Sequence, residues 1–135
     1  MNSPDRTANG FNIRALAVAD ELPRLRHQVA EYVQRSRAPE PVVERVRLAV
    51  SEALTNIIMH AYLGRDPGSM IAEAWCAADH LVLRVSDEGP GLIPRSDSPG
   101  LGMGIPIMAR NADDFRIANR ETTPGTVVSL RFSLR

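Results

Sequence analysis

The chain has 135 residues, of which 44% are apolar and only 4% aromatic, so we expect one domain with a mainly aliphatic core. Sixteen basic and sixteen acidic residues give a formal net charge of zero, which argues against a general nucleic-acid binder, because phosphate contacts need a basic surplus. All sixteen basic residues are arginines, so chemistry that requires a lysine, such as a Schiff base or a Walker-type phosphate loop, is excluded.

The N-terminal segment, MNSPDRTANG, is polar and lacks the apolar run of a signal peptide. The sequence contains no stretch of about 18 apolar residues, so we expect no membrane span. We therefore expect residues 1–10 to be disordered, residues 11–135 to form a single domain, and the protein to lie in the cytoplasm.

The first half of this domain is expected to form a strand and two helices. Residues 11–19 at first alternate apolar with more polar side chains, as a strand does. Apolar residues then recur at helical spacing over residues 20–37, where Asp20 can act as the N-cap. The prolines of segment 37–41 end this helix and can start the next one, which the same spacing extends over residues 40–62.

The second half is expected to supply the rest of a sheet. After a turn, the sequence predicts a hairpin with a tight connection, a glycine-rich loop, a short helix and a closing pair of strands. These elements fall at residues 70–77 and 80–87, 88–104, 105–112, and 114–121 with 125–133. This order favours an α+β fold, a two-layer sandwich whose mixed, mostly antiparallel sheet is covered on one face by helices.

A polar stripe interrupts the second helix. Its inner half, SEALTNIIMHAY, carries Glu52, Asn56 and His60 at steps of four, so their side chains share one face. A carboxylate can act as a general base or hold a water, and an amide oxygen suits Mg²⁺. The alternative is a helix edge that faces solvent. His60 either joins the site or anchors the helix end through a hydrogen bond.

A second polar position, Asp87, ends the apolar strand LVLRV and opens the segment DEGPG. Gly89 and Gly91, which follow it, allow the backbone to approach a ligand closely. A buried carboxylate at this position can accept a hydrogen bond from an exocyclic amine. Farther along the chain, Gly125 and Thr126 place another glycine and a hydroxyl where a strand begins.

The loop segment GLGMGI contributes Gly100, Gly102 and Gly104 and leads into a helix. Its backbone N–H groups and the helix N-terminus form an anion site that suits phosphates. Taken alone, each glycine cluster is also consistent with a simple turn, and the run matches neither a phosphate loop nor the dinucleotide pattern. The combined order is more specific: acid-plus-amide helix, strand–Asp–x–Gly–x–Gly, Gly–x–Gly, and Gly–Thr.

Four segments together carry a resemblance to a known family. SEALTNIIMHAY, SDEGPGL, GLGMGIPIM and PGTVVSL resemble the ATP-binding boxes of the GHKL superfamily, which includes gyrase B, histidine kinases and MutL. Within it, the E-A-x-T-N and H-A/G-Y signature is typical of the small bacterial anti-sigma factors that are serine-protein kinases. The resemblance covers about residues 11–134 and implies the GHKL ATP-binding fold.

The resemblance also implies roles for matching positions. Glu52 would be the general base, Asn56 the Mg²⁺ ligand, and Asp87 the residue that holds the adenine amine of ATP. The other positions would line the nucleotide: Gly89 and Gly91 at the adenine pocket, Thr126 on the adenine side, Gly100, Gly102 and Gly104 at the phosphates, and residues 93–99 as a short lid.

One position departs from this pattern. Some relatives carry an arginine where this chain has Gly100, and that arginine assists at the phosphates. Arg95, in the segment expected to form the lid, can substitute for it. The motifs therefore match nucleotide binding more completely than they match phosphate transfer.

The resemblance further implies an output through protein partners. The chain would sequester a sigma factor, phosphorylate a serine of an anti-anti-sigma antagonist, and pair as a homodimer, without binding nucleic acid directly. Two alternatives are a non-catalytic, ATP-dependent protein-binding switch and an orphan histidine-kinase catalytic domain. The missing dimerisation-histidine helix pair and the short lid count against the second alternative.

Overall fold

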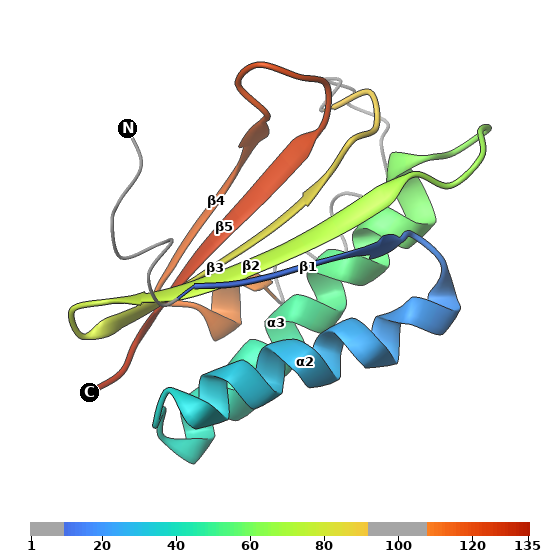
Figure 1. The fold of residues 1–135 in the computed structure, drawn as a ribbon. Coiled ribbons are helices and arrows are strands. Elements are labelled where there is room, and N and C mark those ends of the chain that lie inside the picture. The colour runs from blue at the N-terminus through green and yellow to red at the C-terminus, as the bar shows by residue number, and fades with distance from the viewer. Residues whose placement is uncertain (1–9, 92–107) are drawn as a thin grey trace.

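The computed structural model describes residues 10–91 and 108–135, in which a five-stranded sheet carries two long helices on one face (Figure 1). The strand order is β1-β2-β3-β5-β4, and all the neighbouring strands run antiparallel. The parallel pairing of a mixed sheet is not found in the described residues. The strands are β1 Phe11–Leu16, β2 Ser69–Ala77, β3 His80–Asp87, β4 Asp114–Asn119 and β5 Thr126–Ser133. The expected α+β two-layer sandwich is confirmed.

The first helix, α2, spans Leu22–Arg35, and the predicted N-cap at Asp20 is wrong. Asp20 lies inside a 3₁₀ turn, η1, Ala19–Glu21, that runs directly into α2. An N-cap side chain needs a non-helical backbone at the helix start, whereas Glu21 already has helical dihedral angles and no side chain caps the helix. The helix also ends before residue 37, because Arg37 adopts a left-handed φ of 63°, as residues just beyond a helix often do.

The second helix, α3, spans Glu40–Asn56 and continues as a π turn, η2, Ile57–Ala61. The sequence predicted one regular helix over residues 40–62, and this prediction is wrong in its last turn. A π turn holds more residues per turn than an α-helix and often lies at a functional site. The regular four-residue step from Glu52 to Asn56 is therefore not continued to His60.

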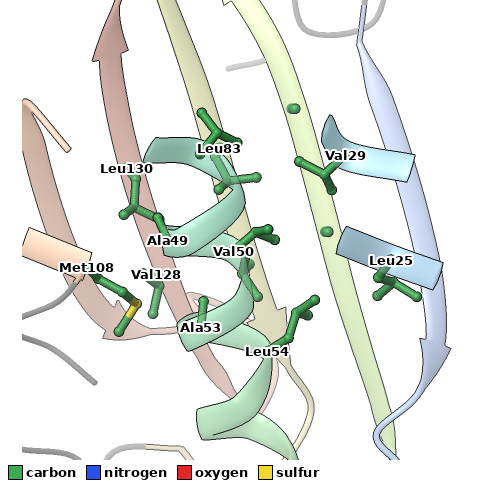
Figure 2. Close-up of a cluster of buried hydrophobic side chains, with 14 of the residues drawn as sticks. Leu25, Val29, Ala49, Val50, Ala53, Leu54, Leu83, Met108, Val128 and Leu130 are labelled. Carbon is green, nitrogen blue, oxygen red and sulfur yellow. The ribbon is translucent and has the colours of Figure 1, made fainter. Parts of the chain in front are cut away.

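The core lies between the helices and the sheet, where the predicted apolar faces meet. Figure 2 shows side chains of α3 directed at those of β3 and β5, with α2 beside them. Met108, from a short helical segment at residues 108–111, is also fully buried there. Each buried Leu or Val side chain contributes about 1.5–3 kcal/mol, so this packing holds α3 firmly against the sheet. The labelled side chains are Leu25, Val29, Ala49, Val50, Ala53, Leu54, Leu83, Met108, Val128 and Leu130.

The other predicted helices and strands are present wherever they fall within the residues that the structure describes. The β2–β3 hairpin closes tightly, with Ala77 opposite His80 in the ladder and a left-handed Ala78 in the connection. The short helix predicted at 105–112 is helical over 108–111, and β4 pairs with β5 as expected. Residues 1–9, predicted to be disordered, lie outside the described residues. Within the described ranges, neither long helix combines the length and apolar character that a membrane span requires.

Candidate functional site

Asp87 is the last residue of β3 and is buried, with 5% of its surface exposed. Its Oδ1 accepts hydrogen bonds from the backbone N–H of Gly89, at 2.9 Å, and of Thr126, at 3.3 Å. Its Oδ2 accepts no hydrogen bond from any residue that the structure describes. One oxygen thus holds the loop and the start of β5 in place, while the described residues leave the other without a donor.

Burial raises the pKa of Asp87, because the low-dielectric surroundings disfavour its charged form. The N–H groups of Gly89 and Thr126 and the charge of Arg120 act in the opposite direction, but the effect of burial is the larger one. Ionisation of this carboxyl in the folded protein therefore comes at a cost in stability. Such a cost is typical of residues selected for function.

We expect Asp87→Asn to raise the free energy of unfolding at neutral pH. The variant resembles the protonated acid and keeps an oxygen for the two N–H groups. Because the folded pKa is raised, the cost of ionisation is absent below the unfolded pKa of about 3.9 and develops as pH rises through the folded pKa. Urea unfolding between pH 4 and 8 should show the variant's advantage shrinking toward acid. A variant less stable than the wild type at pH 7.5 would contradict this expectation.

Glycines bring three backbone segments together around Asp87. A Cβ at Gly89 would collide with the carbonyl oxygen of Ala61, at the end of η2, and a Cβ at Gly125 would collide with the carbonyl of Asp87. A Cβ at Gly91 would lie 2.9 Å from Oδ1 of Asn119. Gly91 and Gly125 also have φ values of 90° and 137°, which favour glycine. The loop after β3 therefore packs backbone-to-backbone against the helix end and the β4–β5 turn.

An ion-pair cluster lies at the exposed rim of this loop. The Glu88 carboxylate lies 3.2 Å from the guanidinium of Arg14 and 3.6 Å from that of Arg120, and the hydrogen bond from Arg14 is the main reason that the pKa of Glu88 is lowered. Arg120 also donates to the carbonyl oxygen of Asp87, at 3.4 Å. Exposed pairs of this kind contribute little to stability, so their main effect is to orient the loop.

The helix side of the site is formed by α3, whose C-terminal turn lies at the end of the sheet where β3 ends (Figure 1). Glu52 and Asn56 are both half-buried. Neither side chain makes a hydrogen bond or ion pair with another described residue. The chain then passes through η2 to Ala61, which packs against Gly89. Glu52 and Asn56 thus lie on the helix whose end adjoins the Asp87 loop.

The other predicted positions stand as follows. His60 is half-buried in η2, and the hydrogen bond expected to anchor the helix end is not found among the described residues. Thr126 contacts Asp87 through its backbone N–H, whereas the sequence analysis singled out its hydroxyl.

The described residues hold no group of three or more His, Cys, Asp or Glu side chains suited to a metal. Gly100, Gly102, Gly104, Arg95 and the predicted lid at 93–99 lie outside the described residues.

Three contributors to the site were missed in the sequence. Arg14 comes from β1 and Arg120 follows β4, so neither is near the loop in the chain. Tyr62 lies nearer in the chain, but its residue type does not show that its hydroxyl accepts a hydrogen bond from the backbone N–H of Glu88, at 2.8 Å. No local sequence pattern predicts the contacts of these three residues with the loop after Asp87. The only signal is that Tyr62 is the last residue of the H-A-Y end of the helix motif.

The carboxylate of Asp87 suits a ligand that carries an amine. Oδ2, which no described residue bonds, can accept a hydrogen bond from an N–H group, and a charged acceptor strengthens such a bond. The glycines let the loop pack closely on the helix end and on the β4–β5 turn, and this packing fixes the position of the carboxylate. On the helix side, a carboxylate and an amide supply oxygen atoms of the kind that Mg²⁺ prefers.

Comparisons with known proteins find a matching family model and several relatives. The family model of the histidine kinase-like ATPase domain matches residues 16–132. An anti-sigma F factor of Clostridium beijerinckii is 27% identical over 134 residues, which cover 91% of this chain and 93% of that protein. The serine-protein kinase RsbW of Listeria monocytogenes is 45% identical over 47 residues, or 35% of this chain, and the chain spans 30% of that relative's length.

A solved structure has the same fold. The crystal structure of the RsbU and RsbW domains of Rv1364c from Mycobacterium tuberculosis superimposes on 93% of this chain with a TM-score of 0.71. The match covers 32% of that longer chain, at 20% sequence identity. At this identity the likeness concerns the fold alone.

Proposed function

Because the chain belongs to the histidine kinase-like ATPase domain family, we propose that it binds Mg²⁺–ATP at the Asp87 site and transfers the γ-phosphate to a serine of a partner protein. The observation that carries this proposal is the buried Asp87 carboxylate, in which Oδ1 is held by two backbone N–H groups and Oδ2 accepts no hydrogen bond from the described residues. The names of its relatives, an anti-sigma F factor and a serine-protein kinase, support the proposed output.

Adenine is the base that this carboxylate would select. Its exocyclic amine donates a hydrogen bond, and Oδ2 of Asp87 would accept it. Gly89 and Gly91 would shape the pocket by letting the loop pack closely on Ala61 and Asn119, where a side chain at either glycine would meet neighbouring atoms. Thr126 would contribute from the opposite side, where its N–H already contacts the same carboxylate.

The phosphates and the metal would lie toward α3. The half-buried Asn56 amide, which has no partner among the described residues, would hold Mg²⁺ through its oxygen, together with phosphate oxygens, in the way that Mg²⁺ sites are usually completed. When bound, Mg²⁺ would neutralise the charge that develops on the transferring phosphate. Gly100, Gly102 and Gly104 are proposed to let the backbone approach the phosphates, with Arg95 supplying a positive charge.

Glu52 is proposed as the general base. Its carboxylate would take the proton from the attacking serine hydroxyl. The serine oxygen would form a bond to the γ-phosphorus as the bond from that phosphorus to the β,γ-bridging oxygen breaks, and ADP would leave. The short helical step between Glu52 and Asn56 would keep the base beside the metal ligand.

The partners would be a sigma factor and an anti-anti-sigma antagonist that carries the target serine, and the chain would pair as a homodimer. Two partners that compete for the protein make a switch if the nucleotide changes their affinities differently. We therefore expect the sigma-factor complex to be tighter with ATP than with ADP. Gly100, in place of an arginine, favours one second candidate, a switch that binds ATP and partners without transferring phosphate.

We expect mass spectrometry to find a phosphoserine on the antagonist after incubation with the protein and Mg²⁺–ATP. Candidate antagonists would come from neighbouring genes, and a reaction without Mg²⁺ is the control that separates enzymatic transfer from background phosphorylation. Sigma-factor binding without phosphoserine would identify the non-catalytic switch. Phosphohistidine on a partner would instead identify an orphan histidine-kinase catalytic domain.

A further inference from the structure

Tyr62 directly follows the π turn η2 and joins three segments of the chain. It is buried, with 9% of its surface exposed. Its hydroxyl donates a hydrogen bond to the carbonyl oxygen of Ser69, at 2.6 Å, and accepts one from the backbone N–H of Glu88, at 2.8 Å. Through one oxygen atom, the end of the α3 segment is therefore bonded to the start of β2 and to the residue after Asp87.

The sheet provides no hydrogen-bond partner for the backbone N–H of Glu88, and Tyr62 supplies one. In the described ladders, β3 pairs with β2 as far as Asp87, opposite Met70, and with β5 as far as Ser86, opposite Val127. Glu88 lies beyond both ladders, so its N–H has no strand partner and bonds to Tyr62 instead. A backbone N–H at the edge of a sheet usually bonds to water, and here a buried side chain fixes it.

The ring of Tyr62 is closely fitted as well. A Cβ at Gly68 would lie 2.6 Å from ring atom Cζ and 2.9 Å from the hydroxyl oxygen, so only glycine allows the ring to occupy this position. The preceding residue, Ala61, packs its carbonyl against Gly89. Two successive residues at the end of η2 thus hold the loop that follows Asp87.

Burial is the main reason that the pKa of Tyr62 is raised, and the charges of Asp87 and Glu88 add to it. The hydroxyl therefore keeps its proton at neutral pH. It can serve as a donor to Ser69 and as an acceptor from Glu88 at the same time, which an ionised phenolate cannot do.

We propose that Tyr62 is a positioning residue that sets the distance between the Asp87 loop and the α3 segment bearing Glu52 and Asn56. This inference rests on the proposed function, in which one nucleotide spans both parts of the site. A nucleotide can span only a limited length from base to γ-phosphate, so it binds best where the base acceptor and the metal ligand are already held at a matching distance. Core packing fixes α3 against the sheet, and the hydrogen bond from Glu88 to Tyr62 fixes the loop against the end of the α3 segment.

The test compares Mg²⁺–ATP affinity by calorimetry for the wild type, Tyr62→Phe and Tyr32→Phe, well below their unfolding temperatures. Tyr62→Phe keeps the ring and removes only the hydroxyl. Tyr32→Phe is the matched control, because Tyr32 is a half-buried tyrosine on α2 that stacks on Phe11, with ring centroids 5.6 Å apart. We expect the affinity to fall about 3- to 10-fold in Tyr62→Phe and to stay unchanged in Tyr32→Phe.

A second readout separates positioning from a general loss of stability. Amide hydrogen exchange at Glu88 should accelerate in Tyr62→Phe and not in Tyr32→Phe, because only the former loses the bond to that N–H. Wild-type affinity in Tyr62→Phe, or an equal loss in both variants, would overturn the role of Tyr62. Absence of ATP binding by the wild type would instead refute the proposed function, so the two failures are distinguishable.

Discussion

Replacing Glu52 with glutamine is expected to lower the rate of phosphate transfer by about 10²-fold or more, while ATP still binds. Glutamine has nearly the same size and keeps hydrogen-bonding atoms, but it cannot take the proton of a serine hydroxyl. Because the Glu52 side chain has no hydrogen bond or ion pair with another described residue, its replacement should also leave the fold intact. The measurement is transfer of labelled γ-phosphate to the antagonist, with ATP affinity determined in parallel.

Glu44→Gln provides the matched control for this variant. Glu44 lies on the same helix, and its exposed carboxylate pairs with Arg47 at 3.6 Å. The control removes one negative charge from α3 without touching the site, so its transfer rate should equal that of the wild type. If Glu52→Gln and wild type transferred phosphate at the same rate, Glu52 would not be the base.

Replacing Gly125 with alanine is expected to abolish nucleotide binding and to lower the free energy of unfolding by about 3 kcal/mol or more. Two effects combine in this variant. The φ of 137° is one that alanine rarely adopts, and the added Cβ would collide with the carbonyl of Asp87. The turn would have to move away, and it would carry with it the Thr126 N–H that bonds to the Asp87 carboxylate.

Gly64→Ala separates these two effects. Gly64 also has a positive φ, 76°, but a Cβ there would meet no atom within 4 Å. Its substitution should cost only the backbone strain, about 1–2 kcal/mol, and should leave ADP binding unchanged. Urea unfolding and calorimetry on both variants make the comparison. Wild-type ADP affinity in Gly125→Ala would show that the turn is not part of the site.

Periodicity predicted most of the secondary structure, because the apolar faces are local properties of the chain. The apolar run LVLRV placed Asp87 at the end of a strand, and the structure has it at the end of β3. The same reasoning failed at the helix ends. Asp20 has the chemistry of an N-cap, but the chain enters α2 through a 3₁₀ turn, and the sequence spacing does not distinguish a π turn from the last α-helical turn.

The contacts that shape the site could not be predicted from the sequence, because their partners lie far apart in the chain. Arg14 and Glu88 are 74 residues apart, Thr126 and Asp87 are 39 apart, and Tyr62 and Glu88 are 26 apart. Each pair is formed by the sheet order and by the packing of α3 on the sheet, which no local motif specifies. The residue types were therefore visible in the sequence, whereas their hydrogen-bond partners were not.

The most direct test of ATP binding at Asp87 is calorimetric titration of ATP and ADP, with Mg²⁺, into the wild type and Asp87→Asn. The variant should be folded and stable, so a loss of affinity cannot be attributed to unfolding. Its amide oxygen should remain with the N–H groups of Gly89 and Thr126, which would place the NH₂ group where Oδ2 now lies. A donor would then face the adenine amine, and we predict a loss of about 10- to 150-fold in affinity. Unchanged affinity in Asp87→Asn would contradict the assignment.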